Sequence, residues 1–320
     1  MSFCFCFENT RIFGSLRSYL EKVSVTIPRG KLIAIGGNED KGTYPNPKSR
    51  KKYYLDFFEL GILKRIVTEI GTENPKIEVI TTASMIPEEV GDRYIGAFSI
   101  LGCDQIGLMH IRKKEEVAEP AYLERLQQAQ GILFTGGDQS RLATLFGGSA
   151  FLQVCQSRYQ QEATFVIAGT SAGAMAMSRV MIKSGSSTEA LMKGAVKLGE
   201  GLGLIPNVII DSHFVKRGRF GRLIEAVSTY PKMIGIGLGE DTGVLITQGN
   251  MIETIGSNLV IIVDGHHIGH NNTPGVKPGT ALSVENLKMH VLAKGNVYDI
   301  IERTFYKDLE THQKKEEIAY

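Results

Sequence analysis

Short apolar runs alternate with longer amphipathic stretches between residues 26 and 230. The runs are rich in Val, Ile, Leu and Phe, whereas the stretches between them carry apolar residues at helical spacing. This pattern predicts strands at 31–35, 76–82, 107–111, 131–135, 165–168 and 208–214. It predicts helices at 54–73, 86–101, 120–129, 140–161 and 217–228.

The last third of the chain has a different pattern. Short apolar segments follow one another there with only turns between them, at 235–239, 243–246, 251–255, 259–263 and 289–292. Alternating strands and helices are typical of a parallel sheet covered on both faces, whereas strands joined by turns are typical of antiparallel pairing. We therefore predict an α/β fold, formed by one domain over residues 26–305, with a mostly parallel sheet and added antiparallel strands in the C-terminal third.

The two ends of the chain lie outside this pattern. Residues 1–25 form a predicted N-terminal extension, which lacks the basic start and continuous apolar stretch of an export signal. Residues 306–320 form a charged tail that we expect to fray from residue 310 onward, and no apolar run is long enough to span a bilayer. The cysteines have no zinc-site spacing and fit a reduced, cytoplasmic protein; they are Cys4, Cys6, Cys103 and Cys155.

The net charge and the glycine content limit the kinds of ligand that the protein can bind. The chain has 36 Lys and Arg against 34 Asp and Glu, so it has no strong overall field to attract nucleic acid or an anionic membrane. Its 36 glycines in 320 residues are about 11 %, compared with about 7 % in an average protein. Many follow predicted strands, at Gly36, Gly136 and Gly169. Because ligands bind beyond the carboxyl ends of parallel strands, we expect these three turns to line one crevice.

The stretch around Ser171 carries the clearest chemical signal. Ser171 lies where the predicted strand 165–168 gives way to a run of small, helix-permissive residues, and Gly169 and Gly173 flank it in a Gly-x-Ser-x-Gly pattern. This pattern indicates a nucleophile elbow, in which small neighbours let the chain turn sharply and the next amide, here of Ala172, donates to an oxyanion. The alternative is a tightly packed strand–helix turn without chemistry.

A serine nucleophile needs a base and a group that orients the base. Of seven histidines, His213 is the best candidate because it ends the apolar strand 208–214, and Glu189 and Asp211 are the candidate orienting carboxylates. Acyl transfer by serine requires no metal or organic cofactor, so we predict none. Three further histidines in the exposed loop 266–280 fit a solvated surface or, alternatively, a metal site; they are His266, His267 and His270.

Taken in order, four motifs resemble those of the cyanophycinases, serine exopeptidases related to dipeptidase E. They are Gly36-Gly-Asn-Glu-Asp-Lys41, Thr135-Gly-Gly-Asp-Gln139, Gly169-Thr-Ser-Ala-Gly-Ala174 and Asp211-Ser-His-Phe214 with the arginines that follow it. The resemblance covers residues 28–303 and implies a flavodoxin-like αβα sandwich that assembles as a homodimer. It also implies a Ser-His-Glu triad and an oxyanion hole, formed here by Ser171, His213 and Glu189 with the backbone of Gly137 and Ala172.

The resemblance implies cyanophycin as the substrate, a poly-aspartate backbone that carries arginine on each side-chain carboxyl and is cleaved to β-aspartyl-arginine. Substrate carboxylates would then bind guanidinium groups, and the substrate guanidinium would bind carboxylates. The implied binding residues are Gln139, Asp138, Asp211, Ser212, Arg217, Arg219, Arg222, Glu39 and Asp40. The alternative for the charged members of this set is that their side chains are simply hydrated at the surface.

One position departs from the family pattern. Ser212 stands where the family commonly has glutamine, and its shorter side chain reaches less far toward a polymer. A related aspartyl or isoaspartyl dipeptidase with another substrate, such as a different β-aspartyl peptide or an α-aspartyl dipeptide, is therefore one alternative function. A catalytically inactive ligand-binding homologue is the other. A glutamine amidotransferase is disfavoured, because that related fold requires cysteine where this chain has Ser171.

Overall fold

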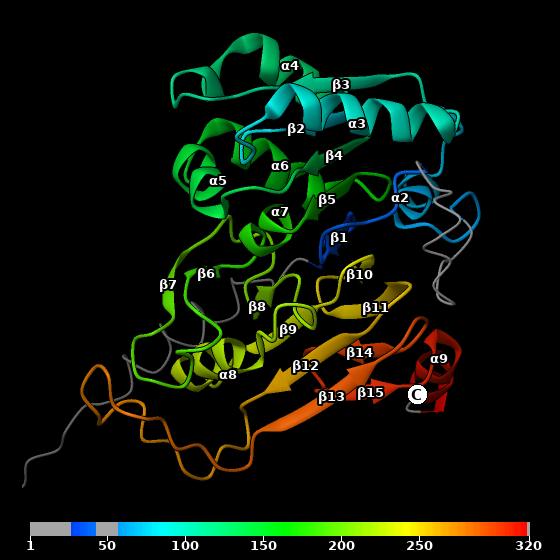
Figure 1. The fold of residues 1–320 in the computed structure, drawn as a ribbon. Coiled ribbons are helices and arrows are strands. Elements are labelled where there is room, and N and C mark those ends of the chain that lie inside the picture. The colour runs from blue at the N-terminus through cyan, green and yellow to red at the C-terminus, as the bar shows by residue number, and fades with distance from the viewer. Residues whose placement is uncertain (1–26, 43–56, 319–320) are drawn as a thin grey trace, which may run out of the picture.

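The computed structural model describes residues 27–42 and 57–318 (Figure 1). Its largest element is a nine-stranded sheet. In spatial order the strands are β15 (Thr304–Tyr306), β14 (Val297–Asp299), β11 (Met251–Gly256), β10 (Thr242–Thr247), β1 (Lys31–Ile35), β5 (Val166–Thr170), β4 (Gly131–Phe134), β2 (Ile77–Ile80) and β3 (Ile106–Met109). The predicted N-terminal extension, with Cys4 and Cys6, lies outside the described residues.

Parallel and antiparallel strands occupy different halves of this sheet. The five strands from β1 to β3 are parallel, with Lys31 opposite Val166 in the pairing of β1 with β5. From β10 to β15 every pairing is antiparallel. The predicted α/β class, with antiparallel strands added by the C-terminal third, is confirmed.

Helices cover both faces of the parallel half (Figure 1). Alternate residues of β1 pack into two different apolar clusters, because successive strand side chains point to opposite faces. Ile33 and Ile35 pack with α2 (Ile62–Ile70) and α3 (Pro87–Ile100). Leu32 and Ala34 pack on the other side, with α4 (Pro120–Gln128), α5 (Gln139–Phe146), α6 (Ala150–Gln161) and α7 (Ala172–Ala176). A short 3₁₀ helix, η2 (Glu116–Ala118), precedes α4.

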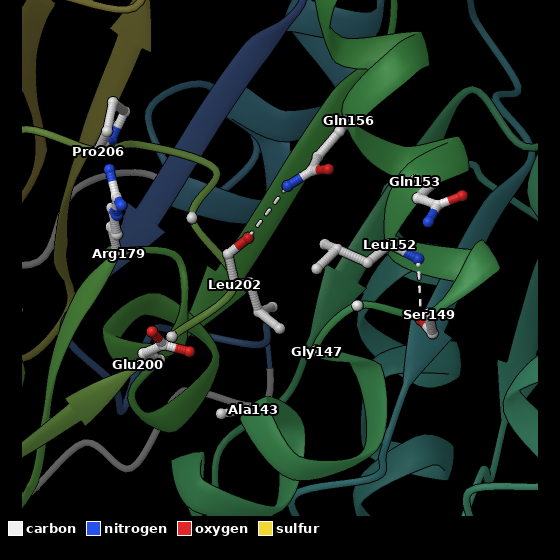
Figure 2. Close-up of a pocket in the computed structure, with 13 residues that line it drawn as sticks. Ala143, Gly147, Ser149, Leu152, Gln153, Gln156, Arg179, Glu200, Leu202 and Pro206 are labelled. Atoms are coloured by element: carbon white, nitrogen blue, oxygen red, sulfur yellow. Dashed lines mark hydrogen bonds between the residues drawn. The ribbon is translucent and has the colours of Figure 1, made fainter.

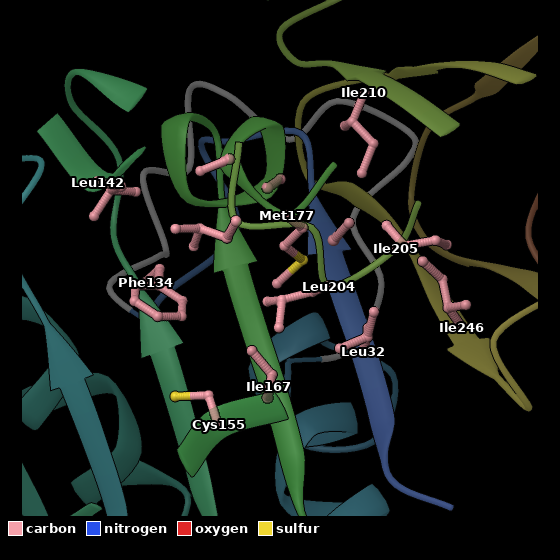
Figure 3. Close-up of a cluster of buried hydrophobic side chains, with 14 of the residues drawn as sticks. Leu32, Phe134, Leu142, Cys155, Ile167, Met177, Leu204, Ile205, Ile210 and Ile246 are labelled. Atoms are coloured by element: carbon pink, nitrogen blue, oxygen red, sulfur yellow. The ribbon is translucent and has the colours of Figure 1, made fainter. Parts of the chain in front are cut away.

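A second sheet holds four strands, in the order β13 (Lys288–Leu292), β12 (Val260–Asp264), β9 (Ile234–Leu238) and β8 (Val208–Asp211). Helix α8 (Phe220–Thr229) packs on it, and β6 (Val180–Ser184) and β7 (Lys197–Glu200) form a separate pair. The prediction of one mostly parallel sheet puts strand 208–214 in the main sheet, which is wrong, because β8 belongs to the second sheet and pairs with β9 in parallel. The apolar cluster in Figure 3 continues from Ile167 of the main sheet to Ile210 of the second.

The two sheets are tied together where β1 and β8 end. The amide of His213 donates to the carbonyl of Gly36 over 2.9 Å, and the amide of Phe214 donates to the carbonyl of Leu238 over 3.0 Å. Buried backbone groups need such partners, and these two bonds let the ends of β1, β8 and β9 meet. Residues that follow these strands therefore gather at one place.

Three predicted segments differ from the structure for local reasons. The helix predicted over 140–161 is two helices, because the chain breaks at Gly147–Gly148 and Ser149 caps α6 by accepting from the amide of Leu152. The helix predicted over 54–73 covers only Ile62–Ile70 among described residues and ends at Gly71, which is left-handed. The tail predicted to fray forms α9 (Leu309–Ile318), which packs on β15.

Candidate active site

Ser171 lies between β5 and α7 in a strained backbone conformation. Its φ of 51° and ψ of −108° place a non-glycine residue in the positive-φ region. A Cβ on Gly169 would lie 2.6 Å from the carbonyl carbon of Gly173, and one on Gly173 would overlap the carbonyl oxygen of Phe134. The turn that presents Ser171 therefore requires glycine at both positions.

The hydroxyl of Ser171 contacts the imidazole of His213. Ser171 Oγ and His213 Nε2 are 3.0 Å apart, although the two residues follow strands of different sheets. Gly37 also lies against the imidazole, since a Cβ there would lie 2.6 Å from His213 Nε2. Gly37 belongs to the motif 36–41, but no role next to His213 was predicted for it.

The carboxylate that holds His213 is Glu240. His213 Nδ1 is 2.8 Å from Glu240 Oε1, which also accepts from Asn38 Nδ2 over 2.7 Å. Lys216 Nζ donates to Glu240 Oε2 over 2.9 Å. A carboxylate with three such donors is fixed in place and in turn fixes the orientation of the imidazole.

Glu240 thus replaces Glu189 as the partner of His213. Glu189 is exposed in the segment that joins β6 to β7, which belongs to neither of the two sheets whose strand ends form the site. Asp211, the other candidate, is also absent from the contacts of His213. A signal for Glu240 existed in the sequence, because Glu240 follows the apolar strand 235–239 as Ser171 follows its own strand.

The ionisation states of His213 and Glu240 favour proton transfer from the hydroxyl of Ser171 to His213 Nε2. Burial lowers the pKa of His213, and the charge of Arg217 lowers it as well, which together outweigh the opposing effect of Glu240. Burial alone would raise the pKa of Glu240, but hydrogen bonds from Lys216 and His213 bring it below its ordinary value. At neutral pH the carboxylate is therefore ionised and accepts from Nδ1–H, which leaves the lone pair of Nε2 for the hydroxyl proton.

A pocket of about 420 Å³ opens beside Ser171 and His213. Gly136 and Gly137 line it, and a Cβ on Gly136 would lie 3.4 Å from Ser171 Cβ. Gly137 has a φ of 141°, and a Cβ there would overlap the carbonyl oxygen of Ala83. Ala172 begins α7, so its amide has no acceptor within the helix. The backbone of Gly137 and Ala172 thus lies next to Ser171, and its oxyanion role stays a prediction.

Two of the three arginines expected to bind substrate are held by Asp211 instead. Arg222 Nε and Nη2 each contact the carboxylate of Asp211 over 2.6 Å. Arg219 Nη1 donates to Asp211 over 3.1 Å and to the carbonyl of Ser212 over 2.8 Å. The side chains of Asp211 and Arg222 are 0 % and 6 % exposed, so they form a buried ion pair. Of these three arginines, Arg217 alone lines the pocket with Ser171.

Several other expected binding residues make contacts within the protein. The hydroxyl of Ser212 is buried and donates to the sulfur of Met175 over 3.2 Å, and Ser212 is not among the residues that line the pocket with Ser171. Gln139 Nε2 donates to the carbonyls of Ile182 and Lys183. Asp138 caps α5 and Asp40 accepts from the amide of Gly42, each over 2.8 to 2.9 Å.

Glu39 lines the pocket but is not free to bind a substrate guanidinium. Its carboxylate accepts from the hydroxyl of Tyr94, from Thr170 Oγ1 over 2.7 Å and from Lys41 Nζ over 2.9 Å. Burial alone would raise its pKa, but the charge of Lys41 and the hydrogen bonds from Tyr94, Thr170 and Lys41 lower it, so Glu39 is ionised. Three further pocket residues were not predicted from the sequence, namely Lys41, Tyr94 and Thr170.

A second, larger hollow lies elsewhere on the protein (Figure 2). It has a volume of about 540 Å³ and is bounded by the turn at Gly147, by α6 and by the segment around Glu200. Gln156 crosses its edge to donate to the carbonyl of Leu202. None of the residues predicted to act in the site lines it, and neither Ser171 nor His213 does.

Two broader expectations concern metals and membranes. Within the described part of the chain, no group of three or more His, Cys, Asp or Glu side chains is arranged to hold a metal ion. His266 and His267 instead stack edge to face, with ring centroids 5.3 Å apart. In residues 27–42 and 57–318, no helix has both the length and the apolar character needed to cross a bilayer.

Comparison with known proteins shows the family of this chain. The sequence profile of peptidase family S51 matches residues 57–254. A cyanophycinase from Trichormus variabilis is 35 % identical over 243 residues, which are 76 % of this chain and 81 % of that protein. A cyanophycinase from Geminocystis herdmanii is 34 % identical over 271 residues, which are 85 % of this chain and 94 % of that protein.

A solved structure shares the fold. The crystal structure of a peptidase from an acI-B1 Actinobacterium superposes with a TM-score of 0.58 at 20 % identity, over 86 % of this chain and 98 % of that one. The profile match covers more than half of the chain, and the cyanophycinases exceed 30 % identity over most of their length. The chain therefore belongs to peptidase family S51 and is a serine-type peptidase.

Proposed function

We propose that this peptidase is a cyanophycinase, which hydrolyses cyanophycin to β-aspartyl-arginine through an acyl-enzyme intermediate. The observation that carries the proposal is the chain of contacts from Ser171 Oγ to His213 Nε2 and from His213 Nδ1 to Glu240 Oε1. Its similarity to two cyanophycinases over most of the chain supports the choice of substrate.

Ser171 is the nucleophile in this mechanism, and its turn is a nucleophile elbow. Ser171 Oγ attacks the carbonyl carbon of the scissile peptide bond while His213 Nε2 takes the hydroxyl proton. The tetrahedral intermediate collapses when Nε2–H gives that proton to the leaving amine, which releases one product. Water then attacks the acyl-enzyme and gives a proton to Nε2. The ester bond breaks as Nε2–H returns that proton to Ser171 Oγ, which releases the second product and restores the neutral imidazole. Glu240 stays ionised throughout and stabilises the imidazolium.

Backbone amides stabilise the oxyanion. The free N–H of Ala172 at the start of α7 is one donor, and the turn that contains Gly137 supplies the other. Both are fixed by the fold, so they need no reorganisation as negative charge develops on the carbonyl oxygen. No metal or organic cofactor enters this scheme.

A related dipeptidase with another aspartyl substrate is the second candidate. Ser212 favours it, because the hydroxyl points at Met175 and offers no contact to a polymer. Relative rates on cyanophycin, on β-aspartyl-arginine oligomers and on α-aspartyl dipeptides separate the two candidates.

The deciding experiment is incubation of the purified protein with cyanophycin, followed by mass analysis of the soluble products. We expect β-aspartyl-arginine from the unaltered protein and none from Ser171→Ala, whose melting temperature should remain unchanged. A protein that binds cyanophycin but releases no dipeptide, and whose Ser171 does not react with a serine-directed acylating reagent, would instead be a binding homologue.

We also propose that the protein forms a homodimer. Strand β13 is an edge of the second sheet and exposes Met289 and Val291, which are 42 % and 56 % exposed. An exposed apolar edge strand is a ready surface for pairing with a second copy. Light scattering coupled to size-exclusion chromatography distinguishes a dimer from a monomer.

A further inference from the structure

The substrate of the proposed function carries many carboxylates, because each arginine is joined through its amino group and keeps its own carboxyl group free. Arg219 and Arg222 are not available to bind these carboxylates, since both donate hydrogen bonds to Asp211. Among described residues, the cations that line the pocket with Ser171 are Lys41, Arg93 and Arg217. These three side chains must then account for carboxylate binding next to Ser171.

Lys41 is the best fixed of the three. Its ammonium donates to Glu39 Oε1 over 2.9 Å and to the carbonyl of Glu39 over 3.3 Å, and it lies 4.8 Å from the centroid of the Tyr94 ring. An ammonium has three N–H donors, so two are used by Glu39 and the third has no acceptor within the described residues. The side chain of Lys41 is 21 % exposed, whereas that of Glu39 is 1 % exposed.

Glu39, which holds Lys41, also contacts the strand that precedes Ser171. Glu39 accepts from Thr170 Oγ1, and Thr170 is the residue directly before Ser171 on β5. Glu39 also accepts from the hydroxyl of Tyr94 on α3. Both donors share the negative charge of Glu39 with Lys41, which leaves the ammonium able to attract a second carboxylate.

The other two cations lie at the exposed rim of the pocket. The side chain of Arg93 is 62 % exposed and lies 3.6 Å from that of Glu89, and Arg217 is exposed as well. Water and salt screen such charges, whereas a partly buried ammonium held by a buried partner is screened less and loses less side-chain entropy on binding.

We propose that Lys41 binds a free carboxylate of the substrate next to Ser171, and that Glu39 and Tyr94 are the residues that position it. The assignment rests on the proposed function, which supplies the substrate. Lys41 then determines specificity for substrates with a carboxylate near the scissile bond. The carboxylate of Glu39 positions Lys41 and does not bind a substrate guanidinium.

The test compares two substrates on two proteins. The first substrate is a short cyanophycin oligomer, and the second is the same oligomer with its carboxylates converted to carboxamides. The unaltered protein should show a KM about tenfold lower for the carboxylate form, because a charge-assisted hydrogen bond contributes about that factor. Lys41→Met should raise the KM for the carboxylate form about tenfold, with kcat nearly unchanged, and should abolish the preference between the two substrates. Lys41→Arg should restore part of the preference.

A matched control removes a lysine at a distance. Lys314 on α9 forms an exposed pair with Glu310, so Lys314→Met should keep the preference of the unaltered protein. If Lys41→Met discriminates between the substrates as strongly as the unaltered protein does, the assignment of Lys41 is wrong while the proposed function stands. If the unaltered protein cleaves neither substrate, the proposed function fails and the assignment fails with it. Acylation of Ser171 by a serine-directed reagent checks that each variant is folded.

Discussion

Gly37 lies against the imidazole of His213, so closely that a Cβ at residue 37 would be 2.5 Å from His213 Cε1 and 2.6 Å from Nε2. Gly37 also has a φ of 100°, which side chains rarely adopt. Gly37 thus limits the place of the imidazole by direct contact, in addition to the hydrogen bond that the carbonyl of Gly36 accepts from the amide of His213.

Gly37→Ala should therefore push the imidazole away from Ser171. A displacement of about 1 Å in a catalytic group costs about 10²-fold in rate, so we expect kcat to fall by about that factor. Steady-state kinetics measure the effect. Gly71→Ala is the matched control, because Gly71 has a φ of 81° but nothing within 4 Å of its added Cβ. It should lose some stability and keep full kcat, and an equal loss of kcat in both variants would mean that backbone strain, not contact with His213, is responsible.

Glu240→Gln should remove the charge that holds His213 in its productive tautomer. Replacing the carboxylate of a catalytic triad by an amide lowers kcat by up to about 10⁴-fold, and we expect a loss between about 10²- and 10⁴-fold here. Glu189→Gln should leave kcat unchanged, because Glu189 is exposed and no contact joins it to His213. The comparison of these two variants in one assay decides between the two glutamates, and a greater loss from Glu189→Gln would contradict the geometry.

The difference between these two glutamates shows what the sequence can and cannot predict. Ser171 and His213 are recognisable because each follows an apolar strand, and a strand and its last residue are local features. The partner of His213 depends on which strands lie next to each other, and the separation of β8 and β9 into a second sheet leaves no local trace. Glu240 follows β9 and reaches His213 only because β8 and β9 are neighbours.

The arginines after His213 illustrate the same limit in a different way. The resemblance implied that Arg219 and Arg222 bind substrate carboxylates, but in the structure the carboxylate that both contact is Asp211. A buried guanidinium requires a buried carboxylate, so burial decides between the two partners. Burial of Arg222 arises from the packing of α8 on the second sheet, and a pattern of charges alone does not reveal it.

The pH dependence of kcat/KM should report the ionisation of His213. Only the neutral imidazole accepts the proton of Ser171, so activity is present above the pKa of His213 and is lost as pH falls through it. Burial and the charge of Arg217 lower that pKa, so the midpoint of the acid limb should lie below the ordinary value of 6.5. Arg217→Gln removes a positive charge that disfavours the imidazolium and should move the midpoint to higher pH.

Arg93→Gln serves as the control for this measurement. Arg93 also lines the pocket, but it is not among the charges that shift the pKa of His213, so the midpoint should stay in place. Both variants lose one positive charge from the same pocket, and a change in substrate binding alters the height of the profile rather than its midpoint. A midpoint that moves to lower pH in Arg217→Gln would contradict the assigned direction.

Asp211→Ala should destabilise the protein strongly, because it leaves the buried guanidinium of Arg222 without a counter-charge. Breaking a buried ion pair on one side costs about 3–5 kcal/mol, which for 320 residues corresponds to a fall in melting temperature of roughly 4–8 °C. Adding Arg222→Met to Asp211→Ala removes the unpaired charge and should recover part of that loss. Calorimetry measures the melting temperatures of both variants and of Glu310→Gln, which removes one partner of an exposed ion pair. Glu310→Gln should not change the melting temperature, so the comparison shows whether the loss in Asp211→Ala comes from burial of the charge or from loss of an ion pair alone. If Asp211→Ala has the same melting temperature as the unaltered protein, the guanidinium of Arg222 does not depend on Asp211 and can turn toward the pocket. The arginines would then bind substrate carboxylates together with Lys41.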